Sequence, residues 1–169
     1  PVKALSVFAR LDGHGEELIN VKITKNQLFL QTTRATVNSI LVEGNFPDYN
    51  SVIPQDCDKV AEIGTAEFLS GLRRAALLTN EESRGVRLAF EKNKLTLSSR
   101  APEQGEAMIV IPARYTSAAL NIGFNPAFII DALKATRTER VSFNMKDPQK
   151  PGLLQSDENY VYVVMPVNL

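Results

Sequence analysis

Apolar and polar residues alternate through many short segments of this chain. In INVKI, residues 19–23, the aliphatic side chains fall on one face of an extended strand, and Asn20 and Lys22 fall on the other. This period of two is typical of a half-buried β-strand. The segment TKNQLFLQT follows, and its Lys25-Asn26 pair predicts a turn. Residues 19–32 are therefore predicted to form a β-hairpin.

The hairpin pattern returns later in the chain. It reappears as VRLAF at 86–90 and EKNKLTLSS at 91–99. The segments KNQLFL at 25–30 and KNKLTL at 92–97 share four of their six residues. We interpret this similarity as an internal repeat.

A helical segment precedes each hairpin. The three segments are VKALSVFARL at 2–11, TAEFLSGLRRAALL at 65–78 and FNPAFIIDALKA at 124–135. Thr65 is the expected N-cap of the second segment and Asn125 of the third, with Pro126 in the first helical turn. Each unit is predicted to run helix, strand, strand, strand. The third unit contains the strand VSFNM, and the last strands of the three units are TVNSILVEG, AMIVIP and YVYVVMP.

A short strand is expected before the second helix, KVAEIG at 59–64, and before the third, AALNIGF at 118–124. No such strand precedes the first helix, and the chain begins without an initiator methionine. We therefore expect half of one domain followed by one complete domain, with an α+β fold of antiparallel sheets and helices on one face.

The segment between the two domains, EGNFPDYNSVIPQDCDK, lacks alternation and contains glycine and prolines, which is typical of a connector. Yet Phe46, Tyr49, Val52 and Ile53 are unusually apolar for a free linker. These side chains either pin the connector to its neighbours or contribute to a binding surface, and the pattern alone does not decide between the two.

The composition of the chain argues against several classes of function. The 19 basic and 19 acidic residues cancel, so no overall field drives binding to nucleic acid or to a membrane. A cytoplasmic location is expected, because no long apolar segment or leader occurs. The single cysteine, Cys57, and single histidine, His14, exclude a disulfide framework and a structural zinc site. No metal, cofactor or enzymatic activity is expected, since phosphate-binding loops and nucleophile–base patterns are missing.

Several stretches, in this order and spacing, resemble the bacterial DNA polymerase III beta subunit family, the sliding clamps. They are EGNFPDYNSVIP, RAALLTNEESRGVRL, PEQGEA, IGFNPAFIIDAL and YVYVVMPVNL. The resemblance covers the whole chain. It implies the DNA-clamp fold of repeated half-domains, with antiparallel outer sheets and helices on the inner face. Residues 1–54 would be the second half of the middle domain plus the connector, and residues 55–169 the complete C-terminal domain.

The resemblance also implies a homodimeric ring, formed by the full-length protein, that encircles double-stranded DNA without reading its sequence. Such a ring holds a DNA polymerase, clamp-loader subunits and other client proteins through short linear motifs. The family's client groove corresponds here to Pro47, Ser51, Val52, Asn125, Phe128, Gln149, Pro151, Val163, Val164, Met165, Pro166, Val167, Asn168 and Leu169. Inward-facing residues of the last strand are expected in the core, which leaves the alternate ones for the groove.

This chain departs from the family pattern at three groove positions. The family often has a basic residue at Ser51, a larger aliphatic residue at Gln149 and arginine at Asn168, so client preference is open. The family groove also uses a Gly-His-Arg loop that this chain does not contain. LDGHGEE at 11–17 is not that loop, and His14 is expected in a turn.

Two further surfaces follow from the resemblance. A helical wheel places Leu77 nearly opposite Phe68, and Leu78 also falls off the apolar stripe. The family uses this leucine pair at the subunit interface; the predicted interface is Arg74, Leu77, Leu78, Glu103 and Glu106. The alternative is a frayed last turn whose leucines tuck into their own domain. The residues predicted to face DNA are Lys3, Arg10, Arg73, Lys134 and Arg137, and ordinary solvated surface is the alternative for each.

One other function stays open from the residues alone. A protein-binding scaffold that never engages DNA would also need a peptide groove and would carry the same apolar C-terminal segment. Linkage to circular DNA distinguishes the two functions.

Overall fold

The structure is a computed structural model, and it describes residues 1–11, 18–46, 48–79, 85–102, 104–157 and 159–168. The chain divides into two compact units, Pro1–Pro47 and Asp48–Leu169. The division falls within the connector, and the sequence analysis placed the boundary a few residues later in the same connector, after residue 54. His14, in the expected turn at 11–17, lies outside the described residues.

The first unit is a helix and a three-stranded antiparallel sheet. It contains α1 (Val2–Leu11), β1 (Asn20–Ile23), β2 (Gln27–Gln31) and β3 (Thr36–Ile40), with strand order β1-β2-β3. The predicted hairpin is confirmed, since Ile23 pairs with Leu28 and the Thr24 N–H donates to the Gln27 carbonyl at 2.9 Å.

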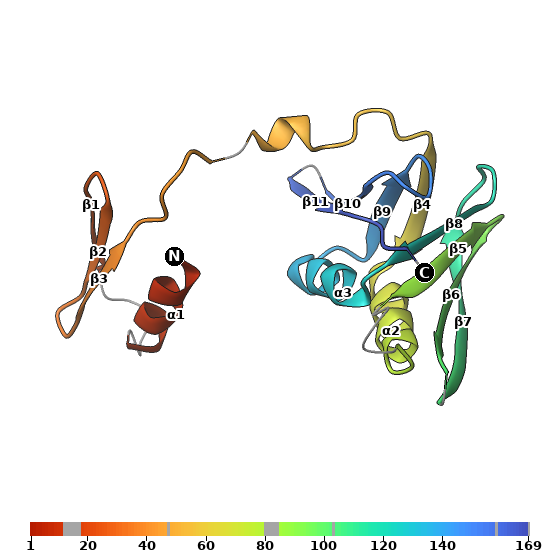
Figure 1. The fold of residues 1–169 in the computed structure, drawn as a ribbon, viewed down its shortest axis with the longest axis horizontal. Coiled ribbons are helices and arrows are strands. Elements are labelled where there is room, and N and C mark those ends of the chain that lie inside the picture. Colours follow the sequence, from red (N-terminus) through yellow and green to blue (C-terminus); the bar gives the residue numbers. More distant parts are fainter. Residues whose placement is uncertain (12–17, 47, 80–84, 103, 158, 169) are drawn as a thin grey trace. The chain divides into compact units, whose positions relative to one another are not determined.

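The second unit contains two copies of one element order (Figure 1). The first copy is β4 (Lys59–Gly64), α2 (Thr65–Ala76), β5 (Val86–Glu91), β6 (Lys94–Ala101) and β7 (Gly105–Arg114). The second copy is β8 (Leu120–Phe124), α3 (Pro126–Ala135), β9 (Arg140–Met145), β10 (Gly152–Ser156) and β11 (Tyr160–Val164). The predicted repeat, with an opening strand before each helix, is confirmed. The strand β10 had not been delimited from the sequence.

The two copies exchange their opening strands. All pairings are antiparallel, and the strand order among the described residues is β11-β10-β9-β4-β7-β6-β5-β8. The opening strand β4 pairs with β9 of the other copy, from Lys59↔Met145 to Gly64↔Arg140. The opening strand β8 pairs with β5 in the same way, from Leu120↔Phe90 to Phe124↔Val86. Neither copy can complete its sheet without the other.

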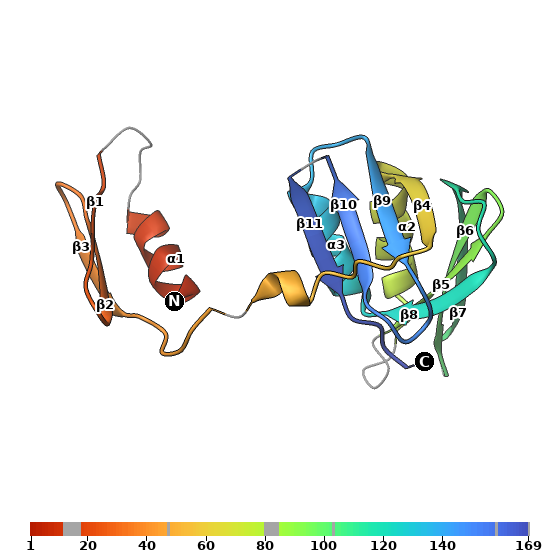
Figure 2. The same cartoon turned by 90° about the horizontal axis from the view of Figure 1, so that it is seen from above.

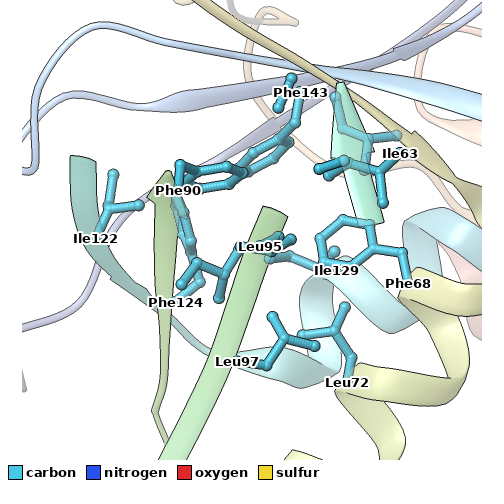
Figure 3. Close-up of a cluster of buried hydrophobic side chains, with 14 of the residues drawn as sticks. Ile63, Phe68, Leu72, Phe90, Leu95, Leu97, Ile122, Phe124, Ile129 and Phe143 are labelled. Atoms are coloured by element: carbon cyan, nitrogen blue, oxygen red, sulfur yellow. The ribbon is translucent and has the colours of Figure 1, made fainter. Parts of the chain in front are cut away.

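The helices α2 and α3 lie side by side on one face of this curled sheet (Figures 1 and 2). The hydrophobic core lies between the two helices and the sheet. Phe68 on α2 and Ile129 on α3 point from the helices toward the strands (Figure 3). The fully buried Phe143 ring contacts Phe90 and Phe124, with ring centroids 6.0 and 5.4 Å apart. This arrangement confirms the predicted α+β class with helices on one face.

One of the two predicted helix caps is confirmed. The Asn125 side chain accepts a hydrogen bond from the Ala127 N–H at 3.0 Å, and Pro126 begins α3. The prediction of Thr65 as an N-cap is wrong, because the extended residue Gly64 occupies that position. Thr65 is already helical, and its N–H donates to the Glu139 carbonyl across the sheet at 2.9 Å.

Candidate functional site

The C-terminal segment changes from core strand to exposed surface within two residues. In β11, Val164 pairs with Gly152 and is 3% exposed, whereas Val163 is half-buried on the opposite face. Met165 follows and is 61% exposed. The Val164 side chain belongs to the core and is unavailable to a client, whereas its neighbours Val163 and Met165 reach the surface.

The segment then runs beside the start of α3. The Val167 N–H donates to the Gly123 carbonyl at 2.8 Å, just before the cap residue Asn125. Phe128, in the first turn of α3, is 53% exposed. We call Asn125, Phe128, Val163, Met165 and Val167 the tail surface. It combines exposed apolar groups with a carboxamide, as expected of a peptide-binding surface.

The connector supplies two more predicted groove residues. A short 3-10 helix, η1 (Tyr49–Ser51), is capped by Asp48, whose carboxylate accepts from the Asn50 N–H at 3.1 Å. The Ser51 hydroxyl donates to the Asp48 carbonyl at 2.7 Å, and Val52 is 54% exposed. That Ser51 and Val52 join the tail surface stays a prediction.

The connector is fixed by charged groups rather than by most of its apolar side chains. The Lys146 ammonium pairs with the Asp56 carboxylate, and the Lys59 ammonium donates to the Lys146 carbonyl at 2.7 Å. The apolar Tyr49 is 59% exposed, whereas Ile53, Pro54 and Cys57 are half-buried. An apolar connector face therefore stays accessible in the second unit.

A small cleft of about 260 Å³ opens beyond the tail surface. Its lining is Arg87, Asn121, Ile122, Gly123, Pro148, Gln149, Val167 and Asn168. Three of these residues, Gln149, Val167 and Asn168, were predicted for the client groove, and the structure brings them together here. Arg87 and Asn121 were missed, because a polar residue in an alternating strand has the same pattern whether it binds a ligand or only water.

Four other residues predicted for the client groove are either half-buried prolines or lie outside the described residues. Pro151 is half-buried just before β10, and Pro166 is half-buried between Met165 and Val167. Pro47 and Leu169 lie outside the described residues.

The predicted interface residues gather at one end of α2. Leu77, the residue after the helix, is 76% exposed, Leu78 is half-buried and Arg74 is exposed. The exposure of Leu77 does not fit the alternative in which both leucines tuck into their own domain. The Ser99 hydroxyl donates to the Ala75 carbonyl at 2.6 Å and so ties this helix end to β6.

Beside this helix end, β7 presents an unpaired edge. It pairs with β6 along its length, with Glu106 opposite Arg100, but with β4 only at Ala113 and Arg114. Within the described residues, its other edge is therefore free from Gly105 to Pro112. Met108 and Val110 on this strand are 68% and 59% exposed. Glu103 lies outside the described residues.

The predicted DNA-facing cations are divided between the two units. Lys134 and Arg137, both exposed, line a larger cleft of about 1060 Å³ between the start of α2 and the end of α3. Lys134 pairs with Asp131 at 3.2 Å. Arg73 is exposed in the last turn of α2, and Lys3 and Arg10 are exposed on α1 in the other unit.

Metal-ligating groups do not cluster in the part of the chain that the structure describes. Burial and the nearby Asp56 and Asp58 carboxylates raise the pKa of the Cys57 thiol, which disfavours the thiolate. Among the described residues, no helix has both the length and the apolar character needed to cross a membrane.

Comparisons with known proteins agree with this geometry. A family model for the DNA polymerase III beta subunit, C-terminal domain, matches residues 50–168. The Beta sliding clamp of Escherichia coli K12 is 34% identical over 167 residues, which are 98% of this chain and 45% of that protein. This chain therefore spans less than half the length of that relative.

Solved structures give the same result. The DNA polymerase III subunit beta from Pseudomonas aeruginosa superimposes with a TM-score of 0.90 at 32% identity, covering 100% of this chain and 47% of that one. A sliding clamp of the same organism bound to griselimycin has a TM-score of 0.87 at 32% identity, covering 100% of this chain and 46% of that one.

Proposed function

This chain belongs to the DNA polymerase III beta subunit family, and we propose that it acts as the C-terminal part of a sliding clamp. In this proposal two full-length subunits form a ring around double-stranded DNA. The ring holds a DNA polymerase and other clients in place and carries out no chemical reaction. Holding by encirclement needs little attraction to DNA, which is compatible with a net charge of zero.

The observation that carries the proposal is the tail surface. Exposed Phe128 and Met165 offer apolar contacts, while the Asn125 amide oxygen accepts the cap hydrogen bond and its NH₂ group would donate to a peptide carbonyl. Burying one Leu or Phe side chain of a client contributes roughly 1.5 to 3 kcal/mol. Two or three such contacts, less the entropy lost on binding, give the exchangeable affinity that a shared docking site needs.

The interface and DNA-facing residues complete the proposal. The β7 edge beside exposed Leu77, which no other described strand pairs from Gly105 to Pro112, suits a partner subunit that adds a strand and covers the leucine pair. Arg74 and Glu106 would provide charged contacts at the rim. Lys134 and Arg137, near the ends of side-by-side helices, would meet phosphates without reading bases.

Peptide binding tests the tail surface directly. The Met165→Ala variant of this chain should bind a peptide with two apolar anchors roughly 10- to 100-fold more weakly, because about 1.5–3 kcal/mol of apolar burial is lost. Fluorescence anisotropy with a labelled peptide measures the dissociation constant. Met108→Ala is the matched control, since that methionine is similarly exposed, on β7. Equal affinity of both variants and the parent chain would reject the tail surface.

Encirclement is tested with the protein at full clamp length and a clamp loader. The ring should remain on nicked circular DNA and slide off after the DNA is linearised, as measured by gel filtration. Failure to become linked to circular DNA would favour the protein-binding scaffold that never engages DNA.

A further inference from the structure

The small cleft beyond the tail surface has a chemistry distinct from an apolar groove. Four of its lining residues, Arg87, Asn121, Gln149 and Asn168, have polar side chains, and none of the described residues that line it is acidic. All four are exposed residues. Its volume of about 260 Å³ is below the ~300 Å³ at which pockets for whole small molecules begin. The cleft therefore suits a single polar side chain.

The fold holds these four residues on separate elements. Arg87 on β5 pairs with Gly123 on β8, and Asn121 lies two residues before Gly123 on the same strand. The Val167–Gly123 hydrogen bond fixes the backbone next to Asn168. The turn that carries Gln149 is held by Asp147, whose carboxylate accepts from the Gln149 N–H at 2.9 Å. The cleft is thus framed by strand pairing and turn hydrogen bonds.

The charge balance of the cleft favours an anion. Arg87 forms no ion pair within the described residues, so its planar guanidinium is available for two parallel hydrogen bonds to a carboxylate. The carboxamides of Asn121, Gln149 and Asn168 each carry an NH₂ donor, and a carboxylate accepts about four hydrogen bonds. The nearest acid in the turn, Asp147, already accepts from the backbone and is not part of the lining.

We propose that this cleft is an acidic subsite, which binds the carboxylate of an aspartate or glutamate that flanks the apolar anchor of a client peptide. The inference rests on the proposed function, because it assumes that clients dock on the tail surface. Met165 of that surface and Asn168 of the cleft are three residues apart, a span of at most about 10 Å in extended chain. An acidic residue a few positions from the anchor reaches the cleft.

The test uses the 169-residue chain and labelled peptides that share two apolar anchors. One series carries a single glutamate moved through the flanking positions, and the matched series carries glutamine at the same positions. At one position the glutamate peptide should bind about 10-fold more tightly, and this preference should shrink as salt rises. Fluorescence anisotropy measures both series.

Substitution of Arg87 identifies the source of the preference. Arg87→Gln should abolish the glutamate preference while leaving affinity for the glutamine peptide unchanged. Arg100→Gln is the control, because it removes the same charge from another exposed arginine of the sheet, on β6. Thermal melts of both variants confirm that the fold is kept.

Three results would overturn the acidic subsite. If glutamate and glutamine peptides bind equally well at every position, clients dock but the cleft takes no carboxylate. If Arg87→Gln weakens single-stranded DNA binding while the glutamate preference persists, the cleft binds phosphate instead. If no anchored peptide binds and Met165→Ala changes nothing, the tail surface fails, and the subsite fails with it.

Discussion

Gly152 is a residue at which a single methyl group would disturb the core. A Cβ atom placed there would lie 2.9 Å from the Cζ atom of Phe143 and 3.0 Å from that of Phe124. Both rings are fully buried and packed edge to face, so they have little room to move. Gly152 also pairs with Val164 at the point where β11 leads into the tail surface.

Gly152→Ala should therefore lower the free energy of unfolding by about 1 to 3 kcal/mol, the usual range for overpacking a close-packed core. Urea denaturation followed by circular dichroism measures this change. Ser98→Ala, at a half-buried site on β6, is the control and should change stability much less. Unchanged stability of Gly152→Ala would mean that the rings shift freely.

Cys57 provides a prediction about pH. Burial first, and then the charges of Asp56 and Asp58, raise the pKa of its thiol. A raised pKa favours the neutral thiol, so the reactive thiolate should be scarce near pH 8 and increase only as pH rises further. Reaction with a chromogenic disulfide should be slower at pH 8 than in the urea-unfolded chain. Equal rates would contradict the raised pKa.

Individual residues differed in how far the sequence could predict them. The cap Asn125 was predicted, because its interaction with Ala127 is local. Thr65 has the right side chain for a cap, but pairing of the preceding strand with β9 holds Gly64 extended and moves the helix start. Arg87 and Asn121 could not be identified, because the residues that surround them come from distant parts of the chain.

At the scale of elements, the end of α2 and the edge of β7 form the surface most suited to a partner subunit. Leu77→Ala and Leu78→Ala, each in a protein of full clamp length, should weaken dimerisation by on the order of 2 kcal/mol. That loss corresponds to roughly a 30-fold higher dimer dissociation constant, measured by analytical ultracentrifugation. Val60→Ala, at an exposed position on β4, should leave the dimer intact.

If both leucine variants dimerise as tightly as the parent protein, Leu77 and Leu78 do not form the subunit interface. The alternative of a frayed helix end would then hold. The exposure of Leu77 argues for the interface, whereas Leu78 is half-buried and has some packing in its own domain. The larger effect is therefore expected at Leu77.

Elements with a regular pattern were predictable from the sequence, and their pairing was not. Alternation located β4, β5 and β9 to within about one residue. The strand β10, GLLQS, was missed because three of its first four residues are buried and it shows no alternation. Exchange of the opening strands could not be predicted, because local patterns contain no information about distant partners.

At the scale of the whole molecule, the two units differ in the size of their hydrophobic cores. Among the described residues, the first unit buries only two hydrophobic side chains, Phe8 and Leu30, and the rest of the buried core lies in the second unit. A single core in a unit shorter than about 70 residues rarely supplies more than a few kcal/mol of stability, and this unit runs only from Pro1 to Pro47. The second unit should therefore account for nearly all of the cooperative stability.

A shortened chain of residues 48–169 should unfold at a midpoint temperature within about 2 °C of the 169-residue chain, because little cooperative structure is removed. Differential scanning calorimetry measures both midpoints. Hydrogen exchange should be fast in β1–β3 and slow in the central strands. A large drop in midpoint on shortening would show that the first unit stabilises the second.

The exchange of opening strands also affects how the protein is made on the ribosome. Lys59 on β4 donates to the carbonyl of Lys146, which is 87 residues further along the chain. At a synthesis rate of about 5–20 residues per second, β4 waits roughly 4 to 17 s for its partner to emerge. During that interval a nascent chain presents an unpaired edge containing Val60 and Ile63, so a chaperone that binds extended apolar segments would be needed most at this stage.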